Sequence, residues 1–451
     1  MSPIAILIAA ESTTSGLTAN GIATSVTKTA PSLFKDIPTV NGTANRMPDN
    51  LTNGSTTTSN SAASFLAELD ASRLTTTLTK DPRPVPAPNS PEVMSQKVCT
   101  DHMIQARWTA SSGWDAPSLQ PYGPLSLMPT ASVLHYATEC FEGMKLYRGF
   151  DGRLRLFRPR LNCSRMLVST NRIALPAFAP PELLKLIVAL CARDGPKWLP
   201  KDRLGAFLYI RPTMIASDSA LGVQRPREAL LFIILACFPS LDTSAATTGG
   251  AGMRLLASCD DMVRAWPGGF GYAKVGANYG PSLVAQGEAR ALGYDQILWL
   301  FGERCSVTEA GASNFFVVWR TRDGRMQLVT APLSEQIILD GVTRRSVLEL
   351  ARERLEKGGC SDLAPLEVVE RKFDMFEIEE AVREGRLVEA FAVGTAFFIA
   401  PVELINFRGK DLKVPMAGGD SGTYAKVIKT WLRNIMWGKE QHKWGYVIEE
   451  E

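Results

Sequence analysis

The sequence has 451 residues, of which 45% are hydrophobic, and its formal net charge is +3. A chain of this length can bury two ordinary cores, so two domains are expected. The small net charge and the lack of long runs of like charge argue against nucleic-acid or membrane partners. Small molecules are therefore the expected partners.

Cysteine and histidine usage argues against a disulfide framework or a metal centre. The eight cysteines are scattered without C-x-x-C spacing, and only His102, His135 and His442 are present. Most zinc sites need more such ligands, so reduced thiols and no metal are expected. No apolar run reaches the roughly 20 residues that cross a bilayer, so no membrane-spanning segment is expected.

Residues 1–91 are rich in Ser and Thr and show little periodicity. Because such a composition buries little apolar surface, this segment is expected to be a disordered tail. Import signals carry many arginines early, whereas the first basic residue here is Lys28, which follows Glu11. The expected location is therefore cytoplasmic, with the mitochondrial matrix as the alternative.

From about residue 92 onward, hydrophobic segments mix strand-like and helical patterns. β-Branched and aromatic residues gather in predicted strands at residues 204–209, 230–237, 296–300, 315–319 and 387–391. Helical spacing predicts a helix over 342–357, with Thr343 at its cap. The uncharged, aperiodic run at 240–252 is typical of a linker. We therefore expect a smaller domain at 92–239 and a larger one at 253–451.

Lys274 lies in the centre of a glycine cluster, GGFGYAKVGANYG, at residues 268–280. The flexible backbone there lets a bulky planar group approach the main chain. No G-x-G-x-x-G match opens a long helix here, which argues against a dinucleotide-binding fold. We interpret Lys274 as a candidate Schiff-base lysine, against the alternative of a solvated surface lysine.

Two further residues suit a pyridoxal cofactor on that lysine. Glu309 lies in SVTEAGASNFF, between a strand-like run and a predicted tight turn. A buried carboxylate there could face the pyridine nitrogen and keep it protonated, whereas the alternative is an ordinary turn carboxylate. Tyr279 could hydrogen-bond the phenolic oxygen of the ring, with core packing as its alternative.

A cofactor phosphate needs an anion site, which a helix N-terminus and an arginine can form together. The predicted helix start offers the amides of Val342 and Thr343, and Arg165 lies on a separate helix-like stretch. The segment GTAFFIAP follows a predicted strand and places Thr395 and Ala396 in a turn whose amides could bind an anion.

Seven ordered segments resemble the branched-chain aminotransferases, a fold-type IV pyridoxal-phosphate family: FEGMKLYRG, LFRPRLNCSRML, YIRPTMIASDSALGVQRP, RAWPGGFGYAKVGANYGPS, QILWLFGE, TEAGASNFFVVW and GTAFFIAPV. The similarity implies an α+β fold of two α/β domains with mainly antiparallel sheets, the C-terminal one larger and barrel-like. It implies transfer of the amino group of L-leucine, L-isoleucine or L-valine to 2-oxoglutarate, giving 2-oxo acids and glutamate. A related aliphatic amino acid in a specialised pathway is also compatible.

The resemblance implies a role for each matching residue. Lys274 carries the cofactor, Glu309 faces the pyridine nitrogen and Tyr279 meets the ring oxygen. The phosphate contacts fall on Arg165, Val342, Thr343 and Thr395. The substrate contacts fall on Tyr136, Phe141, Tyr209, Arg211, Thr395 and Ala396, with Arg211 placed to receive the second carboxylate of glutamate. Leu221 and Val223 would reach the neighbouring subunit's site, which implies a homodimer.

The sequence departs from this family at particular positions. Ala312 stands where close relatives often have threonine, which implies a roomier or less polar side-chain pocket. Phe397 and Ala400 replace the C-x-x-C of some animal members, so thiol regulation is not expected.

Alternative functions are a D-amino-acid aminotransferase, an aminodeoxychorismate lyase or a non-catalytic cofactor-binding protein. The YIRP and FEGMK segments argue against the first two, and the intact lysine and glutamate argue against the third.

Overall fold

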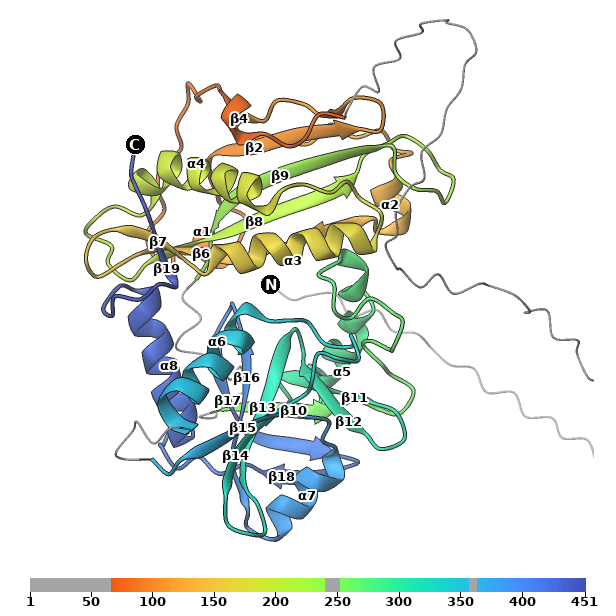
Figure 1. Cartoon of the computed structure of the whole chain (residues 1–451), viewed down its shortest axis with the longest axis vertical. Helices are drawn as coiled ribbons and strands as arrows, with labels where there is room; N and C mark the ends of the chain where they lie inside the picture. Colours follow the sequence, from red (N-terminus) through yellow and green to blue (C-terminus); the bar gives the residue numbers. More distant parts are fainter. Residues whose placement is uncertain (1–65, 240–251, 357–362) are drawn as a thin grey trace, which may run out of the picture. The chain divides into compact units, whose positions relative to one another are not determined.

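Two β-sheets organise the computed structural model, which describes residues 66–239, 252–356 and 363–451 (Figure 1). The described residues belong to one compact unit. The predicted linker at 240–252 lies outside the described residues except for Gly252, as do residues 1–65 of the predicted tail. No helix in the described part of the chain is long and apolar enough to cross a membrane.

The first sheet has the strand order β1-β4-β2-β9-β8-β6-β7-β19, with β3 paired to β2 and β5 paired to β8. The bounds are β1 Thr75–Thr76, β2 Cys99–Thr109, β3 Gly113–Trp114, β4 Ser118–Pro121, β5 Glu139–Phe141, β6 Met144–Arg148, β7 Leu154–Phe157, β8 Phe207–Ala216, β9 Glu228–Cys237 and β19 Gly445–Ile448. All pairings are antiparallel except β1 with β4. Helices α3 (Pro159–Arg172) and α4 (Pro180–Trp198) run along this sheet in Figure 1. Buried apolar side chains of these two helices and of β8 and β9 share one core.

Part of the predicted tail is folded, so the expectation of disorder over 1–91 is wrong for residues 66–91. Leu69 is 2% exposed, and β1 extends the first sheet. The backbone N–H of Thr79 donates to Nε2 of His102 at 3.0 Å, and that of Arg83 donates to Asp101 at 2.8 Å. These partners are distant in sequence, which is why local composition did not reveal them.

The second sheet has the order β12-β11-β10-β17-β16-β13-β14-β15, with β18 paired to β17. The bounds are β10 Met253–Ala257, β11 Gln296–Phe301, β12 Ser306–Ala310, β13 Ser313–Arg320, β14 Met326–Thr330, β15 Leu366–Glu370, β16 Leu387–Gly394, β17 Phe398–Phe407 and β18 Lys410–Lys413. A further pairing between β12 and β13 closes six of these strands into a ring. A closed ring leaves those strands no free edge, and the predicted α+β class with a barrel-like second domain is confirmed.

The predicted domain boundary at the C-terminus needs one correction. Strand β19 pairs antiparallel with β7, so residues 445–448 belong to the first sheet although the chain has already built the barrel. The remaining helices have the bounds α1 Pro91–Met94, α2 Ser132–Tyr136, α5 Ser282–Ala291, α6 Val342–Ala351, α7 Met375–Arg383 and α8 Thr423–Met436. Helices α6 and α8 pack against each other beside the barrel (Figure 1).

The start of α6 differs from the sequence prediction. The N-cap is Gly341, and Thr343 is the second helical residue and is buried. A Cβ at residue 341 would lie 2.2 Å from the side-chain oxygen of Asn314, so only glycine fits there. The α-helix also ends at Ala351, where one π-helical turn follows.

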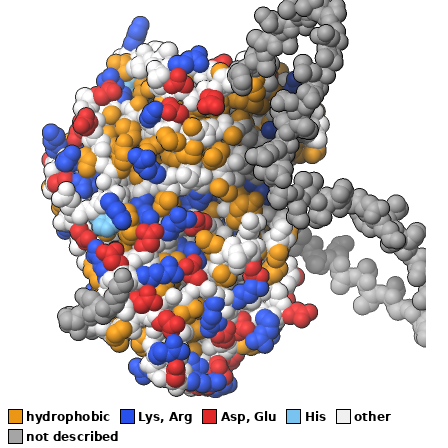
Figure 2. Space-filling view, in the orientation of Figure 1, with side chains coloured by type: hydrophobic (Ala, Val, Ile, Leu, Met, Phe, Trp, Pro, Cys, Tyr) orange, Lys and Arg blue, Asp and Glu red, His pale blue; other side chains and the backbone are white. Residues whose placement is uncertain are grey.

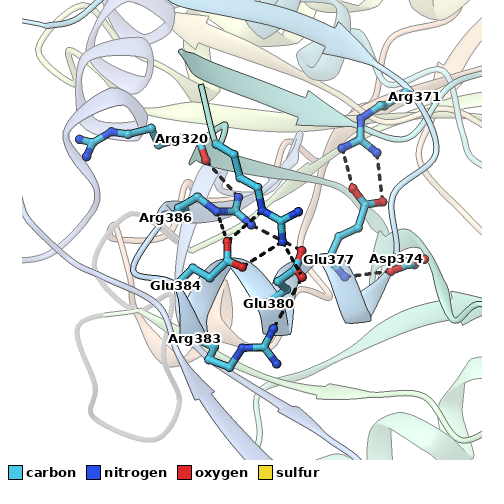
Figure 3. Close-up of polar contacts among 9 residues, drawn as sticks. Arg320, Arg371, Asp374, Glu377, Glu380, Arg383, Glu384 and Arg386 are labelled. Atoms are coloured by element: carbon cyan, nitrogen blue, oxygen red, sulfur yellow. Dashed lines mark hydrogen bonds and ion pairs between the residues drawn. The ribbon is translucent and has the colours of Figure 1, made fainter. Parts of the chain in front are cut away.

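Helix α7 is surrounded by ion pairs (Figure 3). Arg322 and Arg386 bind Glu380 and Glu384, and the N-cap residue Asp374 accepts from the backbone N–H of Glu377 at 2.9 Å. Exposed ion pairs contribute little stability each. We therefore attribute the position of α7 chiefly to its cap and to its buried apolar residues, Met375, Ile378 and Ala381.

Glu389 on β16 caps α8 from inside the core. Its side-chain oxygens accept from the backbone N–H groups of Tyr424 at 3.1 Å and of Ala425 at 2.7 Å. Burial nevertheless raises the pKa of Glu389 to about 7, and these two hydrogen bonds lower it only in part. About half of the Glu389 carboxyl groups are therefore protonated in the folded protein near neutral pH.

Replacing Glu389 with glutamine should flatten the pH dependence of thermal stability. The folded-state pKa of about 7 exceeds the ordinary value of 4.5, so the contribution of Glu389 to stability is full below 4.5 and is lost as pH rises through 7. The wild-type Tm should fall between pH 5 and pH 8 relative to that of Glu389→Gln. Glu403→Gln, on the adjacent strand β17, is the control and should keep the wild-type decline. Parallel pH profiles for wild type and Glu389→Gln would contradict this assignment.

Candidate active site

A cavity of about 430 Å³ lies where α3, β5 and β8 of the first domain meet the barrel and α6. This volume is within the range of about 300–1,000 Å³ that is usual for small-molecule sites. The predicted site residues that line it are Phe141, Arg165, Tyr209, Arg211, Lys274, Tyr279, Glu309, Ala312, Val342, Thr343, Thr395 and Ala396. Tyr136, Leu221 and Val223 do not line it.

Lys274 is held by contacts to the first domain. Its backbone N–H donates to Oγ of Ser169 at 2.8 Å, and its carbonyl accepts from the N–H of Phe141 at 3.1 Å. The side-chain amide of Asn278 donates to the carbonyls of Phe270 and Ala273 and thereby closes the loop around the lysine. The glycine cluster around Lys274 is therefore fixed by hydrogen bonds.

The Lys274 amine points to the tyrosine that was predicted to accompany it. Nζ of Lys274 donates to the hydroxyl of Tyr279 at 3.0 Å. The amine also lies 4.8 Å from the centroid of the Phe141 ring, and that ring is 5.2 Å from the ring of Tyr279. The amine thus lies in an aromatic corner of the cavity, half-buried and hydrogen-bonded.

Glu309 lies near the end of β12, lines the same cavity as Lys274 and is 1% exposed. Its Oε1 accepts from the side-chain amide of Asn314 and from the backbone N–H of Leu339, both at 3.1 Å. Its Oε2 lies 2.8 Å from a guanidinium nitrogen of Arg264, although no hydrogen bond with good geometry forms. One buried carboxylate oxygen therefore still lacks a hydrogen-bond donor.

Arg165 lies between the start of α6 and a buried carboxylate. Its Nε and Nη2 donate to the two oxygens of Glu142 at 2.7 and 2.8 Å, and its Nη1 donates to the carbonyl of Asp340 at 2.9 Å. Burial would raise the pKa of Glu142, but Arg165 and the other nearby donors hold it below its ordinary value. The pair orients the guanidinium beside the free amides of Val342 and Thr343, which suits an anion.

Arg211 and Tyr209 form a second polar corner on β8. Arg211 donates to the hydroxyl of Tyr209 at 3.3 Å, and its guanidinium carbon lies 4.6 Å from the centroid of the Phe141 ring. Nε of Arg211 is buried without a hydrogen-bond partner. Gly143 makes room for this arrangement, because a Cβ there would lie 2.0 Å from the Tyr209 hydroxyl.

The turn between β16 and β17 and the turn between β12 and β13 complete the cavity. Thr395 and Ala396 line it from the first turn, and Ala312 lines it from the second. The small side chains leave the backbone of both turns close to the cavity. The binding of an anion by the amides of the first turn stays a prediction.

Tyr136, Leu221 and Val223 lie together away from this cavity. The hydroxyl of Tyr136, on α2, donates to the carbonyl of Leu221. Their side chains are 40%, 54% and 85% exposed, respectively. The structure thus places Tyr136 outside the cavity and beside the two residues expected to reach a neighbouring subunit, and its contact with substrate stays a prediction.

Sequence reasoning missed Glu142, Arg264 and Asn314. Each is buried or nearly so and contacts a predicted site residue, namely Arg165 or Glu309. Glu142 and Arg264 lie in the matching segments FEGMK and RAWPGG, so a search for partners of the buried charges could have found them. Among the described residues, no cluster of three or more metal-ligating side chains is present.

Comparisons with known proteins agree with this geometry. The model of the family described as amino-transferase class IV matches residues 139–405. The chain therefore belongs to the class IV aminotransferases, and within them to the branched-chain-amino-acid aminotransferases, as the following relatives show.

The similar proteins cover most of the chain. A branched-chain-amino-acid aminotransferase of Monosiga brevicollis is 43% identical over 85% of this chain and 93% of its own length. The cytosolic one of Saccharomyces cerevisiae is also 43% identical, over 85% of this chain and 99% of its own length. The crystal structure of a branched-chain aminotransferase from Thermoproteus uzoniensis with norvaline has a TM-score of 0.57 at 25% identity, covering 76% of this chain and 98% of that one.

Gly143→Ala should impair substrate binding without unfolding the protein. The added methyl group would displace the Tyr209 ring and with it the hydrogen bond to Arg211. Because a shift of about 1 Å in a site can cost up to about 100-fold in rate, we expect kcat/KM for aminotransfer to fall roughly tenfold or more. Gly287→Ala on α5 is the control, since a Cβ there meets open space. Equal kcat/KM values for both variants would contradict the role of Gly143.

Proposed function

We propose that this protein is a pyridoxal-phosphate-dependent transaminase that moves the amino group of L-leucine, L-isoleucine or L-valine to 2-oxoglutarate. The observation that carries this proposal is the convergence of Lys274, Tyr279 and Glu309 on one cavity that also contains anion-binding groups. Relatives named branched-chain-amino-acid aminotransferases align with this chain over 93% and 99% of their own length. A related aliphatic amino acid is the alternative substrate.

The residues present fit pyridoxal phosphate. The pyridine N–H would satisfy the buried Oε2 of Glu309, which lacks a hydrogen-bond donor. Arg165 and the first amides of α6 would hold the phosphate, and Lys274 would carry the aldehyde carbon. A solved relative at 25% identity and a TM-score of 0.55 is complexed with N-(5′-phosphopyridoxyl)-L-glutamate. When bound, the cofactor supplies an electron sink for the substrate's α-carbon.

Lys274, Tyr279 and Glu309 have different roles in the proposed reaction. Nζ of Lys274 would hold the cofactor at rest and, once free, would take the proton from the substrate's α-carbon. The Tyr279 hydroxyl, 3.0 Å from that amine, keeps it aligned. The Glu309 carboxylate, which is paired with Arg264, would stabilise a protonated pyridine nitrogen when the cofactor is bound. Both half-reactions use this one cavity, so ping-pong kinetics are expected.

The cavity has separate contacts for the two ends of each substrate. The amides of Thr395 and Ala396 suit the α-carboxylate, and the buried, unpartnered Nε of Arg211 suits the second carboxylate of 2-oxoglutarate. Phe141 and Ala312 offer apolar walls for an aliphatic side chain. Among the ionisable lining residues, Arg165, Arg211 and Lys274 outnumber Glu309, which favours anionic ligands overall.

We further propose a homodimer in which Leu221, Val223 and Tyr136 complete the partner's site. Leu221 and Val223 are exposed apolar side chains on one loop, and Tyr136 is bonded to that loop. Figure 2 shows hydrophobic side chains gathered over α3 and α4, with charged side chains dominating around the barrel. Exposed apolar patches of this kind suit a subunit interface.

The proposed compartment is the cytosol, with the mitochondrial matrix as the alternative. Saccharomyces cerevisiae relatives named cytosolic and mitochondrial match at 43% and 41% identity, respectively. No nucleic-acid or membrane partner is proposed, because neither the net charge nor a described helix favours one.

L-Leucine alone should change the visible spectrum of the protein purified with pyridoxal phosphate. Without an oxo-acid acceptor, the amino group stays on the cofactor and its visible band is lost. D-Leucine should leave the band unchanged, and Lys274→Ala should lack it from the start, since no other amine holds the cofactor there. Conversion by D-leucine only would favour a D-amino-acid aminotransferase, and no band in the wild type would contradict the proposed function.

A mixed dimer tests the shared site. Val223→Asp should inactivate the partner's site, whereas Lys274→Ala inactivates its own. Co-expression of the two variants should restore activity in heterodimers, because one of their two sites then contains both intact residues. The restored kcat per heterodimer should be about half that of the wild type. No recovery in isolated heterodimers would contradict the proposed contribution across subunits.

A further inference from the structure

Lys145 on β6 is a buried cation beside the active site that none of the assigned roles uses. Lys145 is 5% exposed. Its Nζ donates to the carbonyl of Ala396 at 2.9 Å. The amine also lies 4.1 Å from the centroid of the Phe207 ring and 4.5 Å from that of Phe398. A buried ammonium group is costly unless it is satisfied in this way, so its position needs a reason.

The turn that Lys145 contacts has a strained backbone. Residues 395–397 connect β16 to β17, and Gly394 pairs with Phe398 across the hairpin. Phe398 has a φ of 62°. Hairpins with three-residue loops usually place glycine in this left-handed conformation, and a bulky residue there is strained. Contacts from outside the turn must therefore hold it in place.

Lys145 supplies those contacts on both sides of the turn. It binds the carbonyl inside the turn and lies against the ring of the strained residue at its end. It comes from the first domain, whereas the turn belongs to the barrel. Lys145, Thr343 and Thr395 line one small cavity together. The lysine therefore lies next to two of the residues that are proposed to bind anions.

We propose that Lys145 is a positioning residue that fixes the turn 395–397 and thereby aims its amides at the substrate's α-carboxylate. This inference rests on the proposed function, since it assigns that carboxylate to Thr395 and Ala396. The hydrogen bond orients the peptide group that follows Ala396, and the cation–π contact with Phe398 keeps the hairpin from relaxing. The first domain thus sets the geometry of an anion site in the second.

The test uses the holoenzyme and a ligand that cannot react. 4-Methylpentanoate has the carboxylate and side chain of leucine but no amino group, and calorimetry measures its dissociation constant. Lys145→Met keeps the stem between the two rings but removes the donor and the charge. Tyr147→Phe on the same strand is the control, because Tyr147 contacts the same two rings while its hydroxyl donates to the sulfur of Met436.

We expect Lys145→Met to weaken 4-methylpentanoate binding about tenfold and Tyr147→Phe to leave it within twofold of the wild type. Amide hydrogen exchange in residues 394–398 should rise in Lys145→Met while exchange in β8 stays unchanged, which a general loss of stability would not produce. Binding by Lys145→Met within twofold of the wild type, with unchanged exchange in the turn, would overturn the proposal.

A second variant keeps the proposal testable if Lys145→Met does not fold. Lys145→Gln retains a donor on a shorter side chain and should give an intermediate loss of binding; an effect no larger than that of Tyr147→Phe would contradict the proposal. A separate result would contradict the proposed function, namely a wild-type protein that does not transaminate L-leucine. Unchanged binding in the Lys145 variants of an active enzyme would count against Lys145 alone.

Discussion

The buried ion pair of Glu142 and Arg165 is the interaction on which the site depends. Glu142 is fully buried, and both of its oxygens are bound by one guanidinium. Removal of either partner would leave an uncompensated buried charge, which costs several kcal/mol. Through the carbonyl of Asp340, the same arginine also fixes the residue before the N-cap of α6. The first domain thereby orients the helix terminus that the barrel provides for the phosphate.

The same principle recurs around the cavity. Glu309 is paired with Arg264, and Lys145 is bound by a carbonyl and two aromatic rings. Each buried charge near the cavity is therefore oriented before any ligand arrives. The buried groups around the cavity that lack a hydrogen bond include Oε2 of Glu309 and Nε of Arg211. We propose that a cofactor nitrogen and a substrate carboxylate bind these two groups, because a buried polar group without a hydrogen bond is unfavourable unless a ligand satisfies it.

The fold class and about half of the lining residues could be predicted from the sequence, because long apolar strands and seven ordered motifs carry that information locally. The cap of α6 could not, since Gly341 is required by Asn314, a residue 27 positions earlier in the sequence. The folding of residues 66–91 depends likewise on Asp101 and His102. The grouping of Tyr136 with Leu221 could not be predicted either, because their hydrogen bond spans 85 residues of sequence.

The most direct test of the central claim is to locate the cofactor on the chain. The protein purified with pyridoxal phosphate would first be reduced with borohydride, which converts the lysine–cofactor linkage into a stable bond. The protein would then be digested, and mass spectrometry would identify the peptide that carries the added mass. The account predicts the label on the peptide that contains Lys274 and on no other. A label on Lys145, the other lysine beside the cavity, or no label at all would contradict it.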